Sequence, residues 1–166
     1  MRHFHLTAFA TVLLSLASIG GFGSLGVPGR VDEVLPRKTG LSKMVVEIEL
    51  PSSVSIRMPV PVTLRVRNTG TGPAELALTG RPIAFDIVVE RADGTEVWSR
   101  LHGETVSMML QVTILQPGES LEFKHSWGQR DNDRQAVPAG TYAVRGAVFT
   151  PDEKLESESR RLVIAG

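Results

Sequence analysis

The sequence predicts an all-β protein, built as an antiparallel β-sandwich of about eight short strands. Three observations support this prediction. From Met44 onward, apolar residues recur with a period of two, the spacing that buries one face of a strand. Turn-forming sequences interrupt these segments about every 8–12 residues. No amphipathic helical pattern occurs after Met44, so strands are expected to supply the whole core.

Residues 1–26 differ in composition from the rest of the chain. A short positive segment precedes the apolar run Leu6–Ala17, and small residues and glycines follow. This pattern predicts a secretory signal peptide with a cleavage position after Ala17. The alternative is an uncleaved anchor, because an apolar stretch extended to Leu25 approaches the ~20 residues of a membrane-spanning helix. Both alternatives predict an extracytoplasmic domain, which is secreted, periplasmic or membrane-anchored.

Residues 27–43 are expected to be a linker, because prolines and glycines lie among mixed charges without any period. The folded domain is predicted to span residues 44–166. Its first long strands are 44–50 and 60–67, in which apolar and polar side chains alternate. Pro59 and Pro61 place the start of the second strand at an edge or a bulge, because proline donates no ladder hydrogen bond.

The next segments are predicted to form a short return strand and a hairpin. The turn at Asn68–Pro73 leads into a short strand, Ala74–Thr79, and residues 83–89 form the following apolar face. Asp93–Gly94 suits a two-residue type I′ turn, in which both central residues have positive φ. Val97–Trp98 is then expected to pair back on the preceding strand.

The remaining predicted strands are 110–114, 121–127, 142–149 and 160–164. Within the first of these, Leu110, Val112 and Ile114 alternate with polar residues. Pro117–Gly118 is expected to turn the chain between the first two.

The composition, and the small number of residues able to act in catalysis, predict a protein that is not an enzyme and uses no cofactor. The 18 basic and 18 acidic residues balance, so the sequence has no excess of positive charge for binding nucleic acid. Cysteine is absent. Outside the N-terminal segment the histidines are His102 and His125, and no Gly-x-Ser-x-Gly motif occurs. His125 lies on an apolar strand face and is expected to be a hydrogen-bonded core residue. Two histidines without cysteines make a poor zinc site.

An ordered series of segments resembles one known family. The segments are, in chain order, Asn68-Thr69-Gly70, Phe85-Asp86-Ile87-Val88-Val89, Asp93 to Trp98, Leu115 to Leu121, Trp127, Asp131-Asn132-Asp133 and Val137 to Tyr142. This series resembles the BsuPI family, which is named for an intracellular proteinase inhibitor of a subtilisin-type serine protease. The resemblance covers about Val60 to Phe149 and implies an immunoglobulin-like sandwich. The family usually has glycine where this chain has Arg134, so that loop is expected to differ in conformation.

Two exposed segments are candidates for contact with a protein partner. The first is Met108, Met109 and Leu110, because apolar side chains on an extended, pre-organised segment suit a subtilisin-like cleft. The alternative is that these three residues enter the core with the next strand. The second candidate is Asp131, Asn132 and Asp133, in the loop 129–139. Their side-chain oxygens are of the kind that coordinates Ca²⁺. The flanking arginines, and the tendency of Asp and Asn to hydrogen-bond to their own backbone in turns, favour a structural role instead.

Three aromatic residues are expected to have structural roles. Trp98 and Trp127 are predicted to be core residues rather than platforms for sugars. Tyr142 resembles a tyrosine corner, whose hydroxyl fixes a loop.

The sequence therefore favours an exported, non-enzymatic binding domain that inhibits subtilisin-type serine proteases. The alternative is a cell-envelope interaction or adhesion module that has the same fold and no inhibitory activity. In either case the partner is a protein, and membrane contact is expected only through an uncleaved N-terminal segment.

Overall fold

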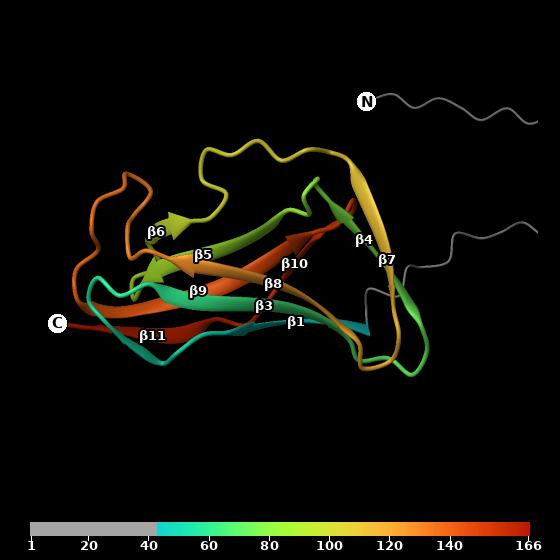
Figure 1. Ribbon diagram of the computed structural model, residues 1–166, viewed down its shortest axis with the longest axis horizontal. Helices are drawn as coiled ribbons and strands as arrows, with labels where there is room; N and C mark the ends of the chain where they lie inside the picture. The colour runs from blue at the N-terminus through green and yellow to red at the C-terminus, as the bar shows by residue number, and fades with distance from the viewer. Residues whose placement is uncertain (1–42) are drawn as a thin grey trace, which may run out of the picture. The chain divides into compact units, whose positions relative to one another are not determined.

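The computed structural model describes residues 43–166 (Figure 1). Its strands are β1 Met44–Glu49, β2 Ser53–Ser55, β3 Val60–Asn68, β4 Ala74–Thr79, β5 Phe85–Arg91, β6 Glu96–Ser99, β7 Leu110–Leu115, β8 Ser120–Trp127, β9 Gly140–Phe149, β10 Lys154–Glu156 and β11 Arg160–Ala165. The predicted all-β fold class is confirmed. β2 and β10 are not predicted by the sequence, because three residues are too few to show a period. The predicted leader, and the predicted linker up to residue 42, lie outside the described residues.

The strands form a sandwich of two larger sheets and one small ribbon. One sheet has the order β1-β3-β8, and the other has the order β2-β11-β9-β5-β6, with β10 on β9. All pairs are antiparallel except β2 with β11. The ribbon is β4 with β7, and it runs steeply across one end of the sandwich (Figure 1). Among the described residues, no helix has the length and apolar character needed to cross a membrane.

The core lies between the two larger sheets. Alternate residues of β3 and β9 are buried and face each other, as the period of two predicts. The sheets approach each other closely where Leu64 of β3 packs on Gly146 of β9, since a Cβ added at Gly146 would overlap Leu64 Cδ1. On the β8 side, Phe123 stacks on Phe85 of β5 with ring centroids 5.0 Å apart.

The ribbon is attached to the sandwich through the buried Asn68. This side chain donates to the carbonyl oxygens of Gly72 and Leu115, both at 2.9 Å, and accepts from the Gly70 amide at 2.9 Å. Its backbone carbonyl accepts from the Gly118 amide at 2.8 Å. Asn68 therefore joins the turn between β3 and β4 to the turn between β7 and β8.

The predicted turn at Pro117–Gly118 is confirmed and is of type II. The Glu119 amide donates to the Gln116 carbonyl at 2.9 Å, and Gly118 has φ 79° at the third position. Proline fixes the second position of such a turn, and glycine allows the positive φ of the third.

The hairpin between β5 and β6 is confirmed, but the predicted type I′ turn is wrong. Gly94 has φ 83°, whereas Asp93 is not among the residues with positive φ. The Gly94 amide donates to the Arg91 carbonyl at 3.0 Å, which makes a type I turn followed by a left-handed glycine. The Asp93 carboxylate accepts from the Thr95 amide at 2.9 Å, and this hydrogen bond lowers the pKa of Asp93. This hydrogen bond caps a loop that is longer than the predicted two-residue turn.

We predict that Asn68→Ala destabilises the domain by about 2–3 kcal/mol, because it leaves buried carbonyl groups without a donor. The free energy of unfolding in urea measures the effect. Thr71→Ala, an exposed change in the same turn, is the control and is expected to change stability by less than about 0.5 kcal/mol. Equal losses for both variants would contradict the role given to Asn68.

We also predict that Gly146→Ala costs about 1–3 kcal/mol, because its methyl group overpacks against Leu64. The loss is expected to be smaller in a Leu64→Val background, where room is available. A double-mutant cycle on unfolding free energies measures this coupling. Additive effects would show that the two residues do not limit the packing of the sheets.

Candidate functional site

The connection between β6 and β7 is an exposed segment that lies beside a concave surface. Residues 100–109 lead from β6, at one end of the sandwich, to β7 at the other (Figure 1). The connection is fixed near both ends: the Glu104 amide donates to the Leu101 carbonyl at 2.9 Å, and the Gly80 amide donates to the Met109 carbonyl at 2.8 Å. Within the described part of the chain, residues 105–108 make no backbone–backbone hydrogen bond.

The candidate residues Met108, Met109 and Leu110 lie at the end of this connection and are exposed. Their exposed fractions are 84%, 49% and 51%. The alternative that they enter the core is therefore wrong. In β7 the polar residues Gln111 and Thr113 are half-buried, while the apolar residues that alternate with them face solvent, so the strand that follows turns its apolar side away from the core.

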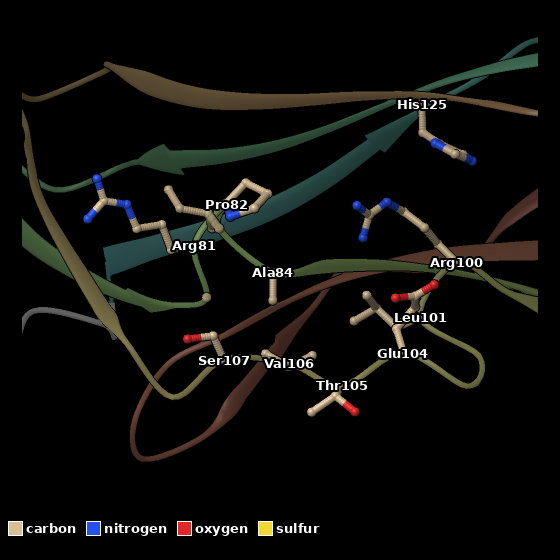
Figure 2. A pocket seen from close by; sticks show the side chains of 12 residues that line it. Arg81, Pro82, Ala84, Arg100, Leu101, Glu104, Thr105, Val106, Ser107 and His125 are labelled. Carbon is tan, nitrogen blue, oxygen red and sulfur yellow. The ribbon is translucent and has the colours of Figure 1, made fainter.

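A hollow of about 430 Å³ lies beneath the connection (Figure 2). Its lining comes from three parts of the chain: residues 80–84, residues 100, 101 and 104–107 of the connection, and His125. Ser107 and His125 lie at opposite ends of it in Figure 2, and no hydrogen bond joins them to each other or to Glu104.

Arg100 and His125 lie on one side of the hollow (Figure 2). Arg100 Nη1 donates to the Phe85 carbonyl at 2.6 Å, and its guanidinium lies 3.8 Å from the centre of the Phe85 ring. Burial lowers the pKa of Arg100. His125 stacks on Trp98 at 5.5 Å, and burial first, then the charge of Arg100, lowers its pKa. The predicted hydrogen bond of His125 is wrong, since none is formed to its side chain among the described residues.

Asp86, which the sequence analysis does not single out, fixes the start of the connection. Its buried carboxylate accepts from the Ser99 hydroxyl at 2.9 and 3.0 Å and from the Leu101 amide at 3.2 Å. The only sequence signal is an acidic residue within an otherwise apolar strand, Phe85–Val89. A buried carboxylate needs such donors, because desolvation without them is costly.

The second candidate segment, Asp131 to Asp133, has structural contacts. Asp131 Oδ1 accepts from the amides of Asp133 and Gln135, at 3.0 and 2.7 Å. Asn132 Oδ1 accepts from the Ser99 amide at 3.0 Å, which attaches the loop to β6. No cluster of metal-ligating side chains occurs in residues 43–166.

Arg134 has the backbone conformation that glycine favours. Its φ is 65°, within the left-handed region, which costs a non-glycine residue about 1–2 kcal/mol. Its carbonyl accepts from Arg130 Nη1 at 2.7 Å. The arginine is thus accommodated in the left-handed region at an energetic cost.

The predicted structural roles of the aromatic residues are confirmed. Trp127 is buried, and its indole N–H donates to the Arg130 carbonyl at 2.8 Å. Trp98 is partly buried and stacks on Trp127 at 5.9 Å. Tyr142 donates its hydroxyl to the Pro138 carbonyl at 2.7 Å, as a tyrosine corner does.

The structure separates the two candidate segments. Met108 to Leu110 lie by the β4–β7 ribbon, whereas the loop that follows β8 lies at the opposite end of the sandwich (Figure 1). The preceding residues 105–108 have unpaired backbone groups among the described residues, whereas Asp131 and Asn132 are held by hydrogen bonds within their loop and to β6. The exposed segment with free backbone groups is therefore the stronger candidate.

The family model for BsuPI, described as an intracellular proteinase inhibitor, matches residues 47–153. The chain belongs to this family. The match includes the whole connection between β6 and β7 and confirms the resemblance found in the sequence. BsuPI is a family of proteinase inhibitors, and a protease is the general class of partner that it implies.

No curated protein matches the chain. Among solved structures, the alkylpurine DNA glycosylase AlkC of Pseudomonas fluorescens is similar over 75% of this chain and 31% of its own, with 13% identity and a TM-score of 0.43. Dimeric latent PorU of Porphyromonas gingivalis is similar over 74% of this chain and 9% of its own, with 17% identity and a TM-score of 0.44. The CARDB domain of a Pyrococcus furiosus protein, in complex with di-metal ions, covers 74% of this chain and 92% of its own, with 15% identity and a TM-score of 0.39. The chain thus spans less than a third of the first two proteins.

The family match overturns the predicted location. The family is described as intracellular, so the prediction of an extracytoplasmic domain is wrong. That prediction depended on the apolar run Leu6–Ala17, which lies outside the described residues. Hydropathy alone does not define export, because several kinds of apolar segment satisfy the same length criterion. The alternative of a cell-envelope module required the same extracytoplasmic location and is rejected for the same reason.

We predict that His125 makes stability depend on pH. Its folded-state pKa lies below the ordinary 6.5, so the unfolded state binds a proton first as the pH falls. Its effect is absent well above pH 6.5, and stability is lost as the pH falls from there through the lower folded-state value. Urea midpoints at about pH 7.5 and about pH 5 measure this loss.

The loss is expected to shrink in His125→Gln and to remain in His102→Gln, an exposed control. If His125→Gln loses as much stability as the unmodified chain over this interval, the carboxylates alone account for the pH dependence.

Proposed function

We propose that this protein inhibits a subtilisin-type serine protease by presenting residues 104–110 to the protease cleft, without catalysing a reaction itself. The observation that carries the proposal is the exposure of Met108, 84%, on a segment whose neighbouring backbone groups are unpaired among the described residues. Membership of a family of proteinase inhibitors supports it.

The backbone of the segment has the properties of a strand that binds by addition. An extended peptide joins a cleft through main-chain hydrogen bonds, while alternate side chains enter pockets. Within residues 43–166, the amides and carbonyls of residues 105–108 are free for such bonds. Because the Leu101 and Gly80 contacts fix the two ends, less conformational entropy is lost on binding.

Met108 is the side chain that we assign to the main pocket of the protease. A methionine side chain is unbranched and polarisable, so it adapts to an apolar pocket of irregular shape. Met109 faces Arg81, whose Nη1 lies 3.8 Å from the Met109 sulfur, and its carbonyl is bonded to Gly80. Met109 therefore supports the segment, and Met108 is free to enter the partner.

We predict that the full chain inhibits at least one member of a panel of subtilisin-type proteases and that Met108→Glu raises the inhibition constant by roughly 30-fold or more, the effect of losing a hot-spot residue of about 2 kcal/mol. Steady-state inhibition kinetics measure it. The matched control is Met58→Glu, because Met58 is 57% exposed and lies before β3, away from the connection.

No inhibition of any protease in the panel would reject the proposed function. Inhibition that Met108→Glu leaves unchanged would keep the function but move the contact to another segment, and Asp133→Ala would then test the exposed side chain of the loop after β8.

A further inference from the structure

The apolar side chains of β7 face solvent. Leu110, Val112 and Ile114 have exposed fractions of 51%, 59% and 59%, whereas Gln111 and Thr113 between them are half-buried. In an ordinary edge strand the opposite arrangement holds, with apolar residues toward the core. The outward face of β7 is therefore an apolar stripe of three side chains.

The outer edge of β7 is also unpaired among residues 43–166. In the described part of the chain β7 pairs with β4 alone, so one row of its amide and carbonyl groups has no ladder partner. Proteins usually protect such edges with charged residues, proline or bulges. β7 has none of these, since its sequence is Leu-Gln-Val-Thr-Ile-Leu.

We propose that β7 pairs with β7 of a second copy of this chain, antiparallel and centred on Val112. In this register Leu110 lies opposite Ile114 of the second copy, and Val112 lies opposite its own equivalent. Gln111 lies opposite Thr113 on the other face. The strand is thus self-complementary about its centre, and the two β4–β7 ribbons become one four-stranded sheet.

Charge favours a second copy over a charged partner. The stripe has no charged residue, so it offers no complementary group to an acidic or basic peptide. The nearest acid on the same face is Glu75, which lies opposite Ile114 on β4. In the proposed sheet the two Glu75 residues are separated by three strand spacings, about 14 Å across the sheet, and by four residues along it, beyond the screening length of about 8 Å at physiological salt. Like-charge repulsion therefore does not oppose pairing.

The proposed pairing shares only Leu110 with the segment 104–110 that we assign to the protease cleft. Met108 precedes the paired residues and would lie opposite Gln116 of the second copy, at the end of the joined strands. Each copy would keep its own residues 104–107 outside the new ladder. Dimerisation and inhibition can therefore be tested separately.

The absence of cysteine in the chain gives a direct test of the register. In Val112→Cys the two new thiols are expected to face each other across the two-fold axis, at a Cβ separation of about 4.5–5.5 Å, close enough for a disulfide after small adjustment. Mild oxidation of the full chain should then give a covalent dimer on a non-reducing gel. Val45→Cys is the matched control, because Val45 is 40% exposed on β1, and it should stay mostly monomeric.

Sedimentation velocity over a range of concentrations provides the second readout. The unmodified chain is expected to show a monomer–dimer equilibrium, and Val112→Lys should raise its dissociation constant at least about tenfold by opposing two charges. Val45→Lys should leave it unchanged, and unfolding in urea verifies that both variants fold. A chain that is monomeric throughout, or equal crosslinking of Val112→Cys and Val45→Cys, would overturn the proposal.

Discussion

The buried side chain of Asn68 is the contact on which the arrangement of the molecule depends. It satisfies two carbonyl groups and one amide from two different turns, and none of these partners lies in its own strand. Buried polar groups that are fully hydrogen-bonded specify one arrangement, because every alternative leaves some of them unpaired. Here the arrangement is a corner, at which β3 turns into β4 and β7 turns into β8.

This corner explains why the candidate surfaces exist. Beyond Asn68 the chain leaves the two large sheets and forms the β4–β7 ribbon, which has its own inner and outer faces. Leu76 and Leu78 of β4 fill the inner face, so β7 can present apolar residues to solvent without loss of the core. The exposed Met108 lies where the connection joins this ribbon.

At the other end of the connection, buried polar contacts have a similar effect. Asp86 accepts from Ser99 and Leu101, and Arg100 covers the ring of Phe85. These contacts hold the first residues of the connection against β5. Further along the connection, residues 105–108 use none of their backbone groups in backbone–backbone hydrogen bonds within the described domain.

Local chemistry and tertiary packing contributed differently to what could be predicted. Pro117–Gly118 and the Tyr142 corner were predictable, because the residue types themselves impose the conformation or supply the hydrogen bond. The Asp93–Gly94 turn type was not, because Asp-Gly fits more than one hairpin and the register shift between Val89 and Glu90 decides between them. His125 was misjudged for a similar reason. A strand pattern shows that its side chain faces inward, but it does not show that a hollow lies there.

The sequence by itself determined the all-β class, most strands, the turns with obligatory residues and the family. Each of these follows from short-range constraints such as the period of two and the φ of proline and glycine. Only the tertiary structure decided which face of β7 is buried. The alternation of Leu110, Val112 and Ile114 with Gln111 and Thr113 is the same for an inward and an outward stripe. The choice was made by β4 and the buried Asn68, which fix the ribbon from residues far away in the chain.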